Sequence, residues 1–577
     1  MLSSKEIARS IPIEDRPISK KKLSGIGNFL GLYGGEHIAA TEFVIGATLV
    51  TLGTKASDIF IGLIIGNILA MLTYTFLCAP IAVDTKLTLY SYLKKVAGPY
   101  VQKVYNVVWG FASIAMAASM LTVSASAVRE IFGVANQTLW YPTSIKFVLI
   151  VIVLGIIVTL VAANGFEAVA KFSSVCAPWM IIVFFAGGLV SLPQLIEITG
   201  FSQVTSLSDF ISLANTHIWN GQVVEGGQQL SVVHVAGFAW MCNLAYHGGL
   251  NDMALFRYAK NYKYGLVSGF GMFIGHFFAW ICAGIMGATA SIVLGQSLSN
   301  LDSGAVTNIT LGGMGLLGVI VAGWTTANPS IYRASLAFQT VFSKLNIKKL
   351  TYIVGAIMTI VGCFPITANI MVIVNIIVLI VPAIGAIALT EHWIFPKIGY
   401  TRYWSNYKNM KVNYAVLLSW GISLVFVVAC TVLNLIHSYF LWLPTYILAS
   451  VSYIVLAGMM GAKEDYTDKV KFDKEVQSEL IKIVDEDADK ETSNIELDKT
   501  LSSYKLHKLI QVISYSLLVV ISVMSVFVFK GNLDVNIFKT YAFVLTLIYF
   551  IAGSTSVYLK QKSFVKNNNT EKIISNS

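Results

Sequence analysis

Residues 32–37 interrupt a long apolar run and read Leu32-Tyr33-Gly34-Gly35-Glu36-His37. The run extends from about Gly25 to Leu52, more than the roughly 20 residues that a helix needs to cross a bilayer. Glu36 falls near the middle of that crossing, where a charge is costly and is kept for function more readily than for packing. Paired glycines loosen a helix, and unwound backbone in a membrane must be buried in protein or line a cavity. We therefore expect a binding site inside the membrane at this break.

The composition is that of a protein with many membrane spans. The chain has 577 residues, 56% hydrophobic and 12% charged, with a mean hydropathy of +0.70. The charged first 24 residues show no cleaved signal peptide. The six cysteines lie in or beside apolar segments without metal-ligand spacing, and we expect them to be reduced. The sequence also lacks a phosphate-binding glycine loop and a zinc motif, which argues against an enzyme or a primary pump and predicts no cofactor.

Apolar windows predict an all-α membrane protein with 12 to 14 spans, starting near residues 25, 57, 101, 145, 171, 233, 263, 311, 350, 369, 413, 439, 508 and 538. The net charge of +10 reflects basic residues in alternate loops. The intervening loops at 193–232, 295–310, 364–369 and 436–441 contain no Lys or Arg. The positive-inside rule then predicts that both termini are cytoplasmic, in a plasma or inner membrane, and nucleic-acid binding is not expected.

Span six repeats the feature of span one and reads Asn243-Leu244-Ala245-Tyr246-His247-Gly248-Gly249-Leu250-Asn251-Asp252. Five spans separate the two breaks, and an odd offset reverses the direction of crossing. Residues 25–192 and 233–395 are therefore expected to be inverted repeats that form one core, 25–395. The other predicted segments are a cytoplasmic tail (1–24), accessory helices 11 and 12 (396–461), a charged cytoplasmic loop (462–507), accessory helices 13 and 14 (508–559) and a second tail (560–577). The loop is expected to be disordered or to form a short helix.

Span eight carries polar groups near mid-depth, in the stretch Val321-Ala322-Gly323-Trp324-Thr325-Thr326-Ala327-Asn328-Pro329-Ser330-Ile331-Tyr332. Hydroxyl and carbonyl oxygens suit a small hard cation, and the hydroxyls of Thr325 and Thr326 with unwound carbonyls at Gly34 and His37 would supply them for sodium. The alternative is that both threonines bond back to carbonyls one turn earlier.

The order of these motifs resembles the nucleobase:cation symporter-1 family of purine, cytosine, hydantoin and allantoin permeases. The resemblance covers roughly residues 24–440 and rests on the first break together with Ile64-Ile65-Gly66-Asn67, Asp252 with Arg257 and Tyr258, Trp324-Thr325-Thr326, and Pro382-Ala383-Ile384-Gly385. It implies a leucine-transporter-type fold with broken helices 1 and 6, alternating access, and a planar heterocycle held near helices 1, 3, 6, 8 and 10. It also implies a sodium site formed by Gly34, His37, Ala322, Thr325 and Thr326.

The chain departs from the family pattern at the substrate position. Trp109 matches the tryptophan of helix 3, but Asn243 stands where a second tryptophan is expected in helix 6, and Trp240 lies one turn earlier. Ser113 replaces the usual amide of helix 3, and Ile38 replaces a polar residue of helix 1. Glu36, His37 and His247 would take the polar role, and a carboxylate favours a donor-rich or cationic ligand.

We predict that the substrate is contacted by Glu36, His37, Trp109, Ser113, Asn243, Tyr246, His247 and Asn328. Trp109 can instead fill the bundle, Asn328 can join helices, and Glu36 can carry a proton or pair with a histidine. We expect Glu42 to extend a proton relay or to reach a water-filled vestibule. We expect His276 to be a hydrogen-bonded histidine of the core. Gates or structural ion pairs are expected at Asp252, Arg257, Arg333 and Glu391.

The sequence thus predicts a monomeric or weakly oligomeric secondary transporter that imports cytosine, a purine or a related nitrogen heterocycle with Na⁺ or H⁺. A first alternative is the same fold with an amino acid, amine or thiamine-precursor-like substrate. A second is a channel or a transporter-like receptor, which would carry a continuous polar stripe, whereas the polar groups here cluster at mid-depth.

Overall fold

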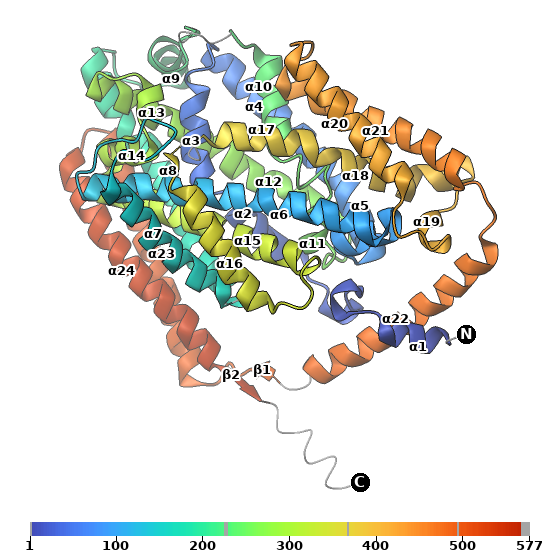
Figure 1. Ribbon diagram of the computed structural model, residues 1–577. Helices are drawn as coiled ribbons and strands as arrows, with labels where there is room; N and C mark the ends of the chain where they lie inside the picture. The colour runs from blue at the N-terminus through green and yellow to red at the C-terminus, as the bar shows by residue number, and fades with distance from the viewer. Residues whose placement is uncertain (1–2, 165, 224–228, 366–368, 493–494, 567–577) are drawn as a thin grey trace.

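The computed structural model describes residues 3–164, 166–223, 229–365, 369–492 and 495–566, and it forms a bundle of packed helices (Figure 1). In these residues ten helical segments are long and apolar enough to cross a membrane. They are Ala56–Thr85, Leu89–Ile131, Ile145–Ala163, Lys171–Thr199, Tyr262–Leu294, Ile370–Ile398, Tyr414–Val432, Ser438–Met460, Ser502–Phe529 and Val535–Lys562. The predicted multi-pass, all-helical fold class is confirmed. The four other predicted spans are the two broken helices, the more polar α15 (Gly313–Gln339) and the short α16 (Ile347–Gly362).

Helix 1 is broken, as the sequence predicts. It consists of α2 (Ile26–Glu36) and α3 (Ala40–Leu49), separated by His37, Ile38 and Ala39. The break lies later than the glycine pair suggested: Gly34 and Gly35 are still helical, and the chain becomes extended only at Ala39 (φ −126°, ψ −177°). Helix α2 continues through the pair to Glu36, and the N–H of the C-cap residue His37 still bonds to the carbonyl of Tyr33.

Helix 6 is broken in the same way. Its first half, α10, covers Val232–Cys242, and its second half, α11, covers only Met253–Phe256. The intervening ten residues form turns, with Leu250 in the left-handed region at φ 61°. Gly385 of α18 packs directly on this segment, because a Cβ there would lie 1.9 Å from the carbonyl oxygen of Gly248.

The remaining helices complete two related halves around the breaks. The core helices are α4 (Ala56–Thr73), α5 (Ala79–Thr85), α6 (Leu89–Ile131), α7 (Ile145–Ala163), α8 (Phe166–Thr199), α12 (Ser268–Met272), α13 (Trp280–Leu294), α17 (Ile370–Ile380) and α18 (Pro382–Leu389). Third helix α6 packs along eighth helix α15, and fourth helix α7 packs along ninth helix α16. Equivalent helices of the two halves therefore meet, as inverted repeats require.

Shorter elements and the accessory helices surround this core. They are α1 (Ser4–Ser10), α9 (Leu207–Leu213), α14 (Ser303–Leu311), α19 (Trp404–Tyr407), α20 (Tyr414–Val432), α21 (Ser438–Met460), α22 (Thr467–Thr492), α23 (Ser502–Phe529) and α24 (Val535–Lys562). Strands β1 (Ile495–Leu497) and β2 (Phe564–Lys566) pair antiparallel, with Ile495 opposite Lys566. Single π- or 3₁₀-helical turns occur at Ile13–Asp15, Lys20–Lys22, Tyr74–Cys78, Ala214–Ile218, Tyr262–Val267, Phe273–Ala279, Leu298–Asn300, Thr390–Ile394 and Phe395–Ile398.

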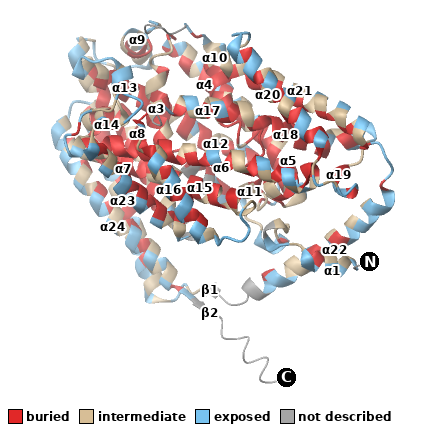
Figure 2. Cartoon of the chain, viewed as in Figure 1, coloured by how far each residue is buried: buried red, intermediate tan, exposed pale blue. Residues whose placement is uncertain are grey.

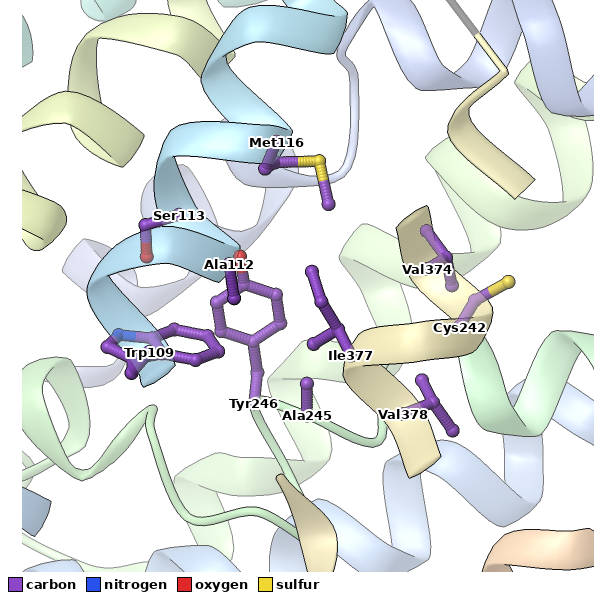
Figure 3. Close-up of a pocket in the computed structure, with 10 residues that line it drawn as sticks. All are labelled: Trp109, Ala112, Ser113, Met116, Cys242, Ala245, Tyr246, Val374, Ile377 and Val378. Atoms are coloured by element: carbon purple, nitrogen blue, oxygen red, sulfur yellow. The ribbon is translucent and has the colours of Figure 1, made fainter. Parts of the chain in front are cut away.

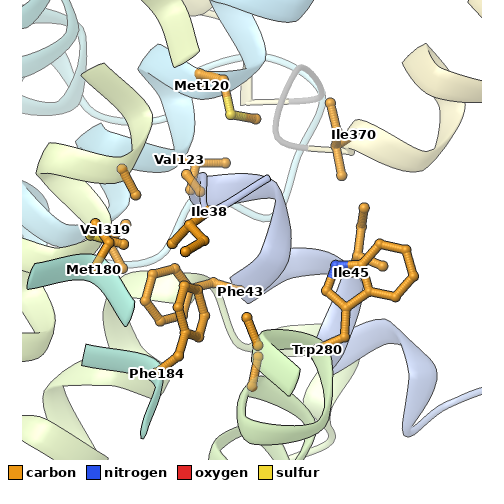
Figure 4. Packing of buried hydrophobic residues seen from close by; sticks show 14 of the residues in the cluster. Ile38, Phe43, Ile45, Met120, Val123, Met180, Phe184, Trp280, Val319 and Ile370 are labelled. Carbon is orange, nitrogen blue, oxygen red and sulfur yellow. The ribbon is translucent and has the colours of Figure 1, made fainter. Parts of the chain in front are cut away.

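Buried residues concentrate in the centre of the bundle, and exposed residues lie mostly on the outer helices (Figure 2). Val512 and Val519 of α23 and Ile551 of α24 are exposed, which fits a surface that faces lipid. Around α3 the packing is dry: Phe43 stacks on Phe184 at 4.2 Å, next to Ile38 and Val319 (Figure 4). This face of the second half of helix 1 thus packs against apolar side chains.

The N-terminal tail is held by α22, in a contact that we name the tail clasp (residues 4–22 with 467–492). Ala8 of α1 packs against Val476 and Leu480 of α22. Lys21 Nζ lies 2.5 Å from Asp489, and Arg16 lies 3.4 Å from Asp487. The charged segment predicted as a loop therefore contains a long helix, and that helix binds the opposite charge of the tail.

Candidate functional site

A small cavity lies between helix 3 and the break of helix 6 (Figure 3). Its lining comes from three elements: Trp109, Ala112, Ser113 and Met116 of α6, Cys242, Ala245 and Tyr246 of helix 6, and Val374, Ile377 and Val378 of α17. Its volume is about 20 Å³, room for about one water molecule. Pockets for drug-sized ligands measure about 300–1,000 Å³, so the cavity is closed to a ligand of that size unless these three elements separate.

Two aromatic rings form the polarisable part of the cavity wall. The rings of Trp109 and Tyr246 meet edge to face, with centroids 5.8 Å apart at 83°. The guanidinium of Arg333 lies over the Tyr246 ring, 5.0 Å from its centroid. Aromatic faces of this kind bind flat rings by stacking. Ser113 adds a hydroxyl to an otherwise apolar wall of α6 and α17.

Three predicted substrate residues therefore line the cavity together: Trp109, Ser113 and Tyr246. His37, Asn243, His247 and Asn328 are buried nearby in the bundle without lining it. The side chain of Glu36 lies outside the described part of the chain. Helix α17 begins helix 10, which the resemblance implies near the substrate, but sequence reasoning did not name its cavity residues Val374, Ile377 and Val378. A stretch such as 370–380, apolar except for Asn375, gives little sign of which side faces a ligand.

Asn328 and His247 each have a buried polar atom without a hydrogen-bond partner, Oδ1 and Nδ1 respectively. The His247 ring stacks on Tyr74, with centroids 4.4 Å apart at 28°. A buried polar atom without a partner costs about 1–3 kcal/mol. Water or ligand groups that reach these atoms in an open state would recover that free energy.

A second polar cluster joins the two breaks to helix 7, the segment Tyr262–Leu294. Glu42, the third residue of α3, accepts hydrogen bonds from the Ala39 N–H (2.5 Å) and the Thr41 hydroxyl (2.8 Å). His276 places Nε2 3.7 Å from the Glu42 carboxylate and Nδ1 2.9 Å from the Asn243 amide nitrogen. The expectation that Glu42 reaches an open vestibule does not describe this state, since the residue is only 2% exposed. The signal that was missed is the Ala39-to-Glu42 spacing, in which a carboxylate caps the start of a helix.

The predicted sodium ligands are engaged in local contacts. Thr325 and Thr326 both donate to the Ala322 carbonyl, at 2.9 and 3.3 Å, which is the back-bonded alternative. A hydroxyl that donates its hydrogen keeps its oxygen lone pairs, so this bonding is compatible with cation binding. The His37 carbonyl lies against helix 7, where a Cβ on Gly275 would be 1.8 Å from it.

The four predicted gate residues lie near the second halves of helices 6, 8 and 10. Asp252 is the N-cap residue of α11, and Arg257 bonds to the Ala254 carbonyl and lies over the Tyr258 ring. Glu391 is fully buried and accepts hydrogen bonds from the Tyr403 N–H (2.6 Å) and the Tyr453 hydroxyl. Arg333 lies over the ring of Tyr246, which lines the cavity, but Arg333 does not itself line it.

No protein-family model and no curated protein sequence matches the chain. Solved structures do match it. Mhp1, a nucleobase-cation-symport-1 family transporter, in a closed conformation with bromovinylhydantoin bound, is similar over 82% of this chain and 99% of its own, at TM-score 0.59 and 12% identity. The chain has the leucine-transporter-type fold.

Two further solved structures agree. The inward-facing conformation of Mhp1 matches at TM-score 0.60 and 12% identity, over 78% of this chain and 94% of its own. A Na⁺-coupled sialic acid symporter in a substrate-bound, outward-open state matches at TM-score 0.54 and 12% identity, over 80% and 95% of the two chains. The predicted resemblance is therefore confirmed at the level of the fold.

Proposed function

We propose that this protein is a secondary transporter that moves a nucleobase or a related nitrogen heterocycle across a plasma or inner membrane together with a cation. The observation that carries the proposal is the aromatic cavity at the break of helix 6, where the rings of Trp109 and Tyr246 meet edge to face in the wall of a small volume. A fold with broken helices at a central site supports alternating access. The likeness to Mhp1 structures supports a planar, ring-shaped substrate.

The start of α3 supports a substrate without a carboxylate. In transporters with broken helices, the positive end of a half-helix can bind an anionic group of the substrate. Here the protein's own Glu42 occupies that end of α3, with the Ala39 N–H as donor. The carboxylate of an amino-acid substrate would therefore compete with Glu42 for this helix end, and a neutral or cationic heterocycle fits better.

The orientation in the membrane is part of the proposal. The basic residues of alternate loops favour cytoplasmic termini. Substrate contacts are assigned to Trp109, Ser113 and Tyr246 in the closed cavity. Glu36, His37, Asn243, His247 and Asn328 are assigned to the site as it opens. Two coupling ions remain candidates: protons, and sodium bound at Gly34, His37, Ala322, Thr325 and Thr326. We propose no chemical conversion of the substrate.

Uptake of radiolabelled cytosine into proteoliposomes that contain the purified protein tests this function. Saturable uptake that needs a sodium or proton gradient and is inhibited by unlabelled purines or hydantoins is the expected result. Uptake inhibited by amino acids and not by heterocycles would instead favour the alternative substrate class. Cation flux without saturation would favour a channel.

A further inference from the structure

Glu42 is the carboxylate that the fold buries most completely next to a break. One of its oxygens binds the Ala39 N–H and the Thr41 hydroxyl, while the other faces His276 Nε2 at 3.7 Å. That distance is longer than a hydrogen bond. The carboxylate and the imidazole are therefore adjacent but not bonded to each other in this closed state. A permanent negative charge at such a position in a membrane is costly, and protonation removes most of the cost.

His276 is held so that it faces this carboxylate. Its ring stacks on Trp280, with centroids 4.5 Å apart at 11°, and meets His37 edge to face at 4.9 Å. With Asn243 oriented as in the structure, the amide nitrogen donates to Nδ1. The one hydrogen of a neutral imidazole then lies on Nε2, the nitrogen that faces Glu42.

Titratable groups surround Glu42. Among the described residues, no lysine or arginine forms an ion pair with it. His276 of helix 7 lies 3.7 Å from the carboxyl group, and Cys242 of α10 is close enough to interact with it electrostatically. His37 and His247 interact with His276 in the same way, and the His37 ring lies 4.9 Å from the His276 ring. The side chains around α3 from α6, α8, α15 and α17 are apolar (Figure 4): Met120, Val123, Met180, Phe184, Val319 and Ile370. A proton is thus the natural neutralising partner of this carboxylate.

Asn243 connects this pair to the cavity. It directly follows Cys242 and precedes Ala245 by two residues, and both of these line the cavity. A ligand that separates helix 6 from α6 and α17 therefore moves the residue that orients His276. We propose that the Glu42 carboxyl group, facing His276 across the gap between helices 1 and 7, binds the coupling proton of this transporter. The inference rests on the proposed function and names its coupling ion.

The first test uses full-length protein in sodium-free proteoliposomes with the interior one pH unit more alkaline. Wild-type protein that couples one proton to each cytosine accumulates it about ten-fold, since one pH unit corresponds to about 1.4 kcal/mol. The Glu42→Gln variant keeps the acceptor for the Ala39 N–H and is expected to exchange labelled cytosine without accumulating it. Glu130→Gln, at a partly exposed carboxylate that pairs with Arg129 at 2.8 Å, is the matched control and accumulates like wild type.

A second measurement needs no substrate. Infrared difference spectra of the whole protein between acidic and alkaline pH are expected to show a protonated-carboxyl band that is absent from Glu42→Gln and present in Glu130→Gln. His276→Gln is expected to shift the pH at which this band titrates. If wild-type protein neither exchanges nor accumulates cytosine, the proposed function is wrong for this substrate, while the spectra still decide on Glu42. Undiminished accumulation by Glu42→Gln, or a difference spectrum of Glu42→Gln that equals the wild-type spectrum, would overturn the proton site.

Discussion

Single side chains decide whether the cavity can hold a flat ring. Trp109 supplies the largest aromatic face in its wall, and Tyr246 is fixed from the other side by Arg333. Both positions lie where helix 3 meets the break of helix 6. A ligand that stacks on Trp109 therefore also depends on where Tyr246 is placed.

Replacing Trp109 with alanine is expected to weaken cytosine binding by about ten-fold, because one aromatic stacking contact contributes about 0.5–1.5 kcal/mol beyond the buried area. Trp109→Phe keeps a ring and is expected to lose less. Trp140→Phe is the control, because Trp140 is 63% exposed and stacks on Phe364 outside the cavity. The apparent KM of cytosine uptake measures the effect; an unchanged KM in Trp109→Ala would place the substrate elsewhere.

The predicted sodium site is testable at the same scale. If Thr325 and Thr326 only bond back to Ala322, replacing Thr325 with valine removes one side-chain hydrogen bond of about 0.5–1.5 kcal/mol and leaves the ion dependence of uptake unchanged. If they bind sodium, the same variant raises the sodium concentration needed for half-maximal uptake. Cytosine uptake across a sodium titration, with wild-type protein alongside, separates the two roles.

At the scale of elements, glycines allow the broken helices to pack closely. Gly275 of helix 7 lies against the His37 carbonyl, and Gly385 of helix 10 lies against the Gly248 carbonyl. Each half of the fold therefore has a glycine contact between an intact helix and the unwound segment of a broken one. The two contacts are not equivalents in the inverted repeats, because the five-span offset pairs the seventh helix with the second and the tenth with the fifth.

Gly385→Ala is expected to destabilise the protein by about 1–3 kcal/mol, because its Cβ would overlap the Gly248 carbonyl oxygen. Gly421→Ala in α20 is the matched control: no heavy atom lies within 4 Å of the added Cβ, so alanine is expected to be neutral or slightly stabilising there. Thermal unfolding of both variants in detergent gives the comparison. Equal melting temperatures would mean that helix 10 can move away from the break at no cost.

Much of this arrangement could be predicted from the sequence. Glycine pairs with polar neighbours inside apolar runs, Gly34-Gly35 and Gly248-Gly249, indicated both broken helices and the five-span offset. The exact unwound residues could not be read, because helix 7 determines where α2 ends. The burial of Glu42 was also hidden, and so were the α17 residues that line the cavity, because a helix with a single polar residue has little polar face to mark its orientation.

At the scale of the whole molecule, the tail clasp links the two ends of the helical core. The tail precedes α2 directly, and Ser24 bonds through its N–H to the Tyr258 carbonyl beyond α11. Helix α22 follows accessory helix α21 and contacts α1. The first half of helix 1 is therefore tied through the tail to a segment more than 400 residues later in the chain.

Replacing Leu480 with aspartate is expected to release the tail, because it places a charge in the apolar contact with Ala8. Limited proteolysis is then expected to cut the first 24 residues faster than in wild-type protein. Lys21→Glu alone is expected to have a smaller effect, since an exposed ion pair contributes about 0–1 kcal/mol. Identical cleavage rates in Leu480→Asp and wild type would show that the clasp does not protect the tail.

The burial of Glu42 also determines on which step of transport the membrane voltage would act. With a proton and a neutral heterocycle bound, the central site carries no net charge as access changes from one side to the other. The empty site returns with a bare carboxylate, so the electric field acts on that return. A potential of 100 mV, negative inside, is worth about 2.3 kcal/mol per charge, about fifty-fold in accumulation. Voltage would then set how fast the empty protein resets and leave the loaded crossing almost unaffected.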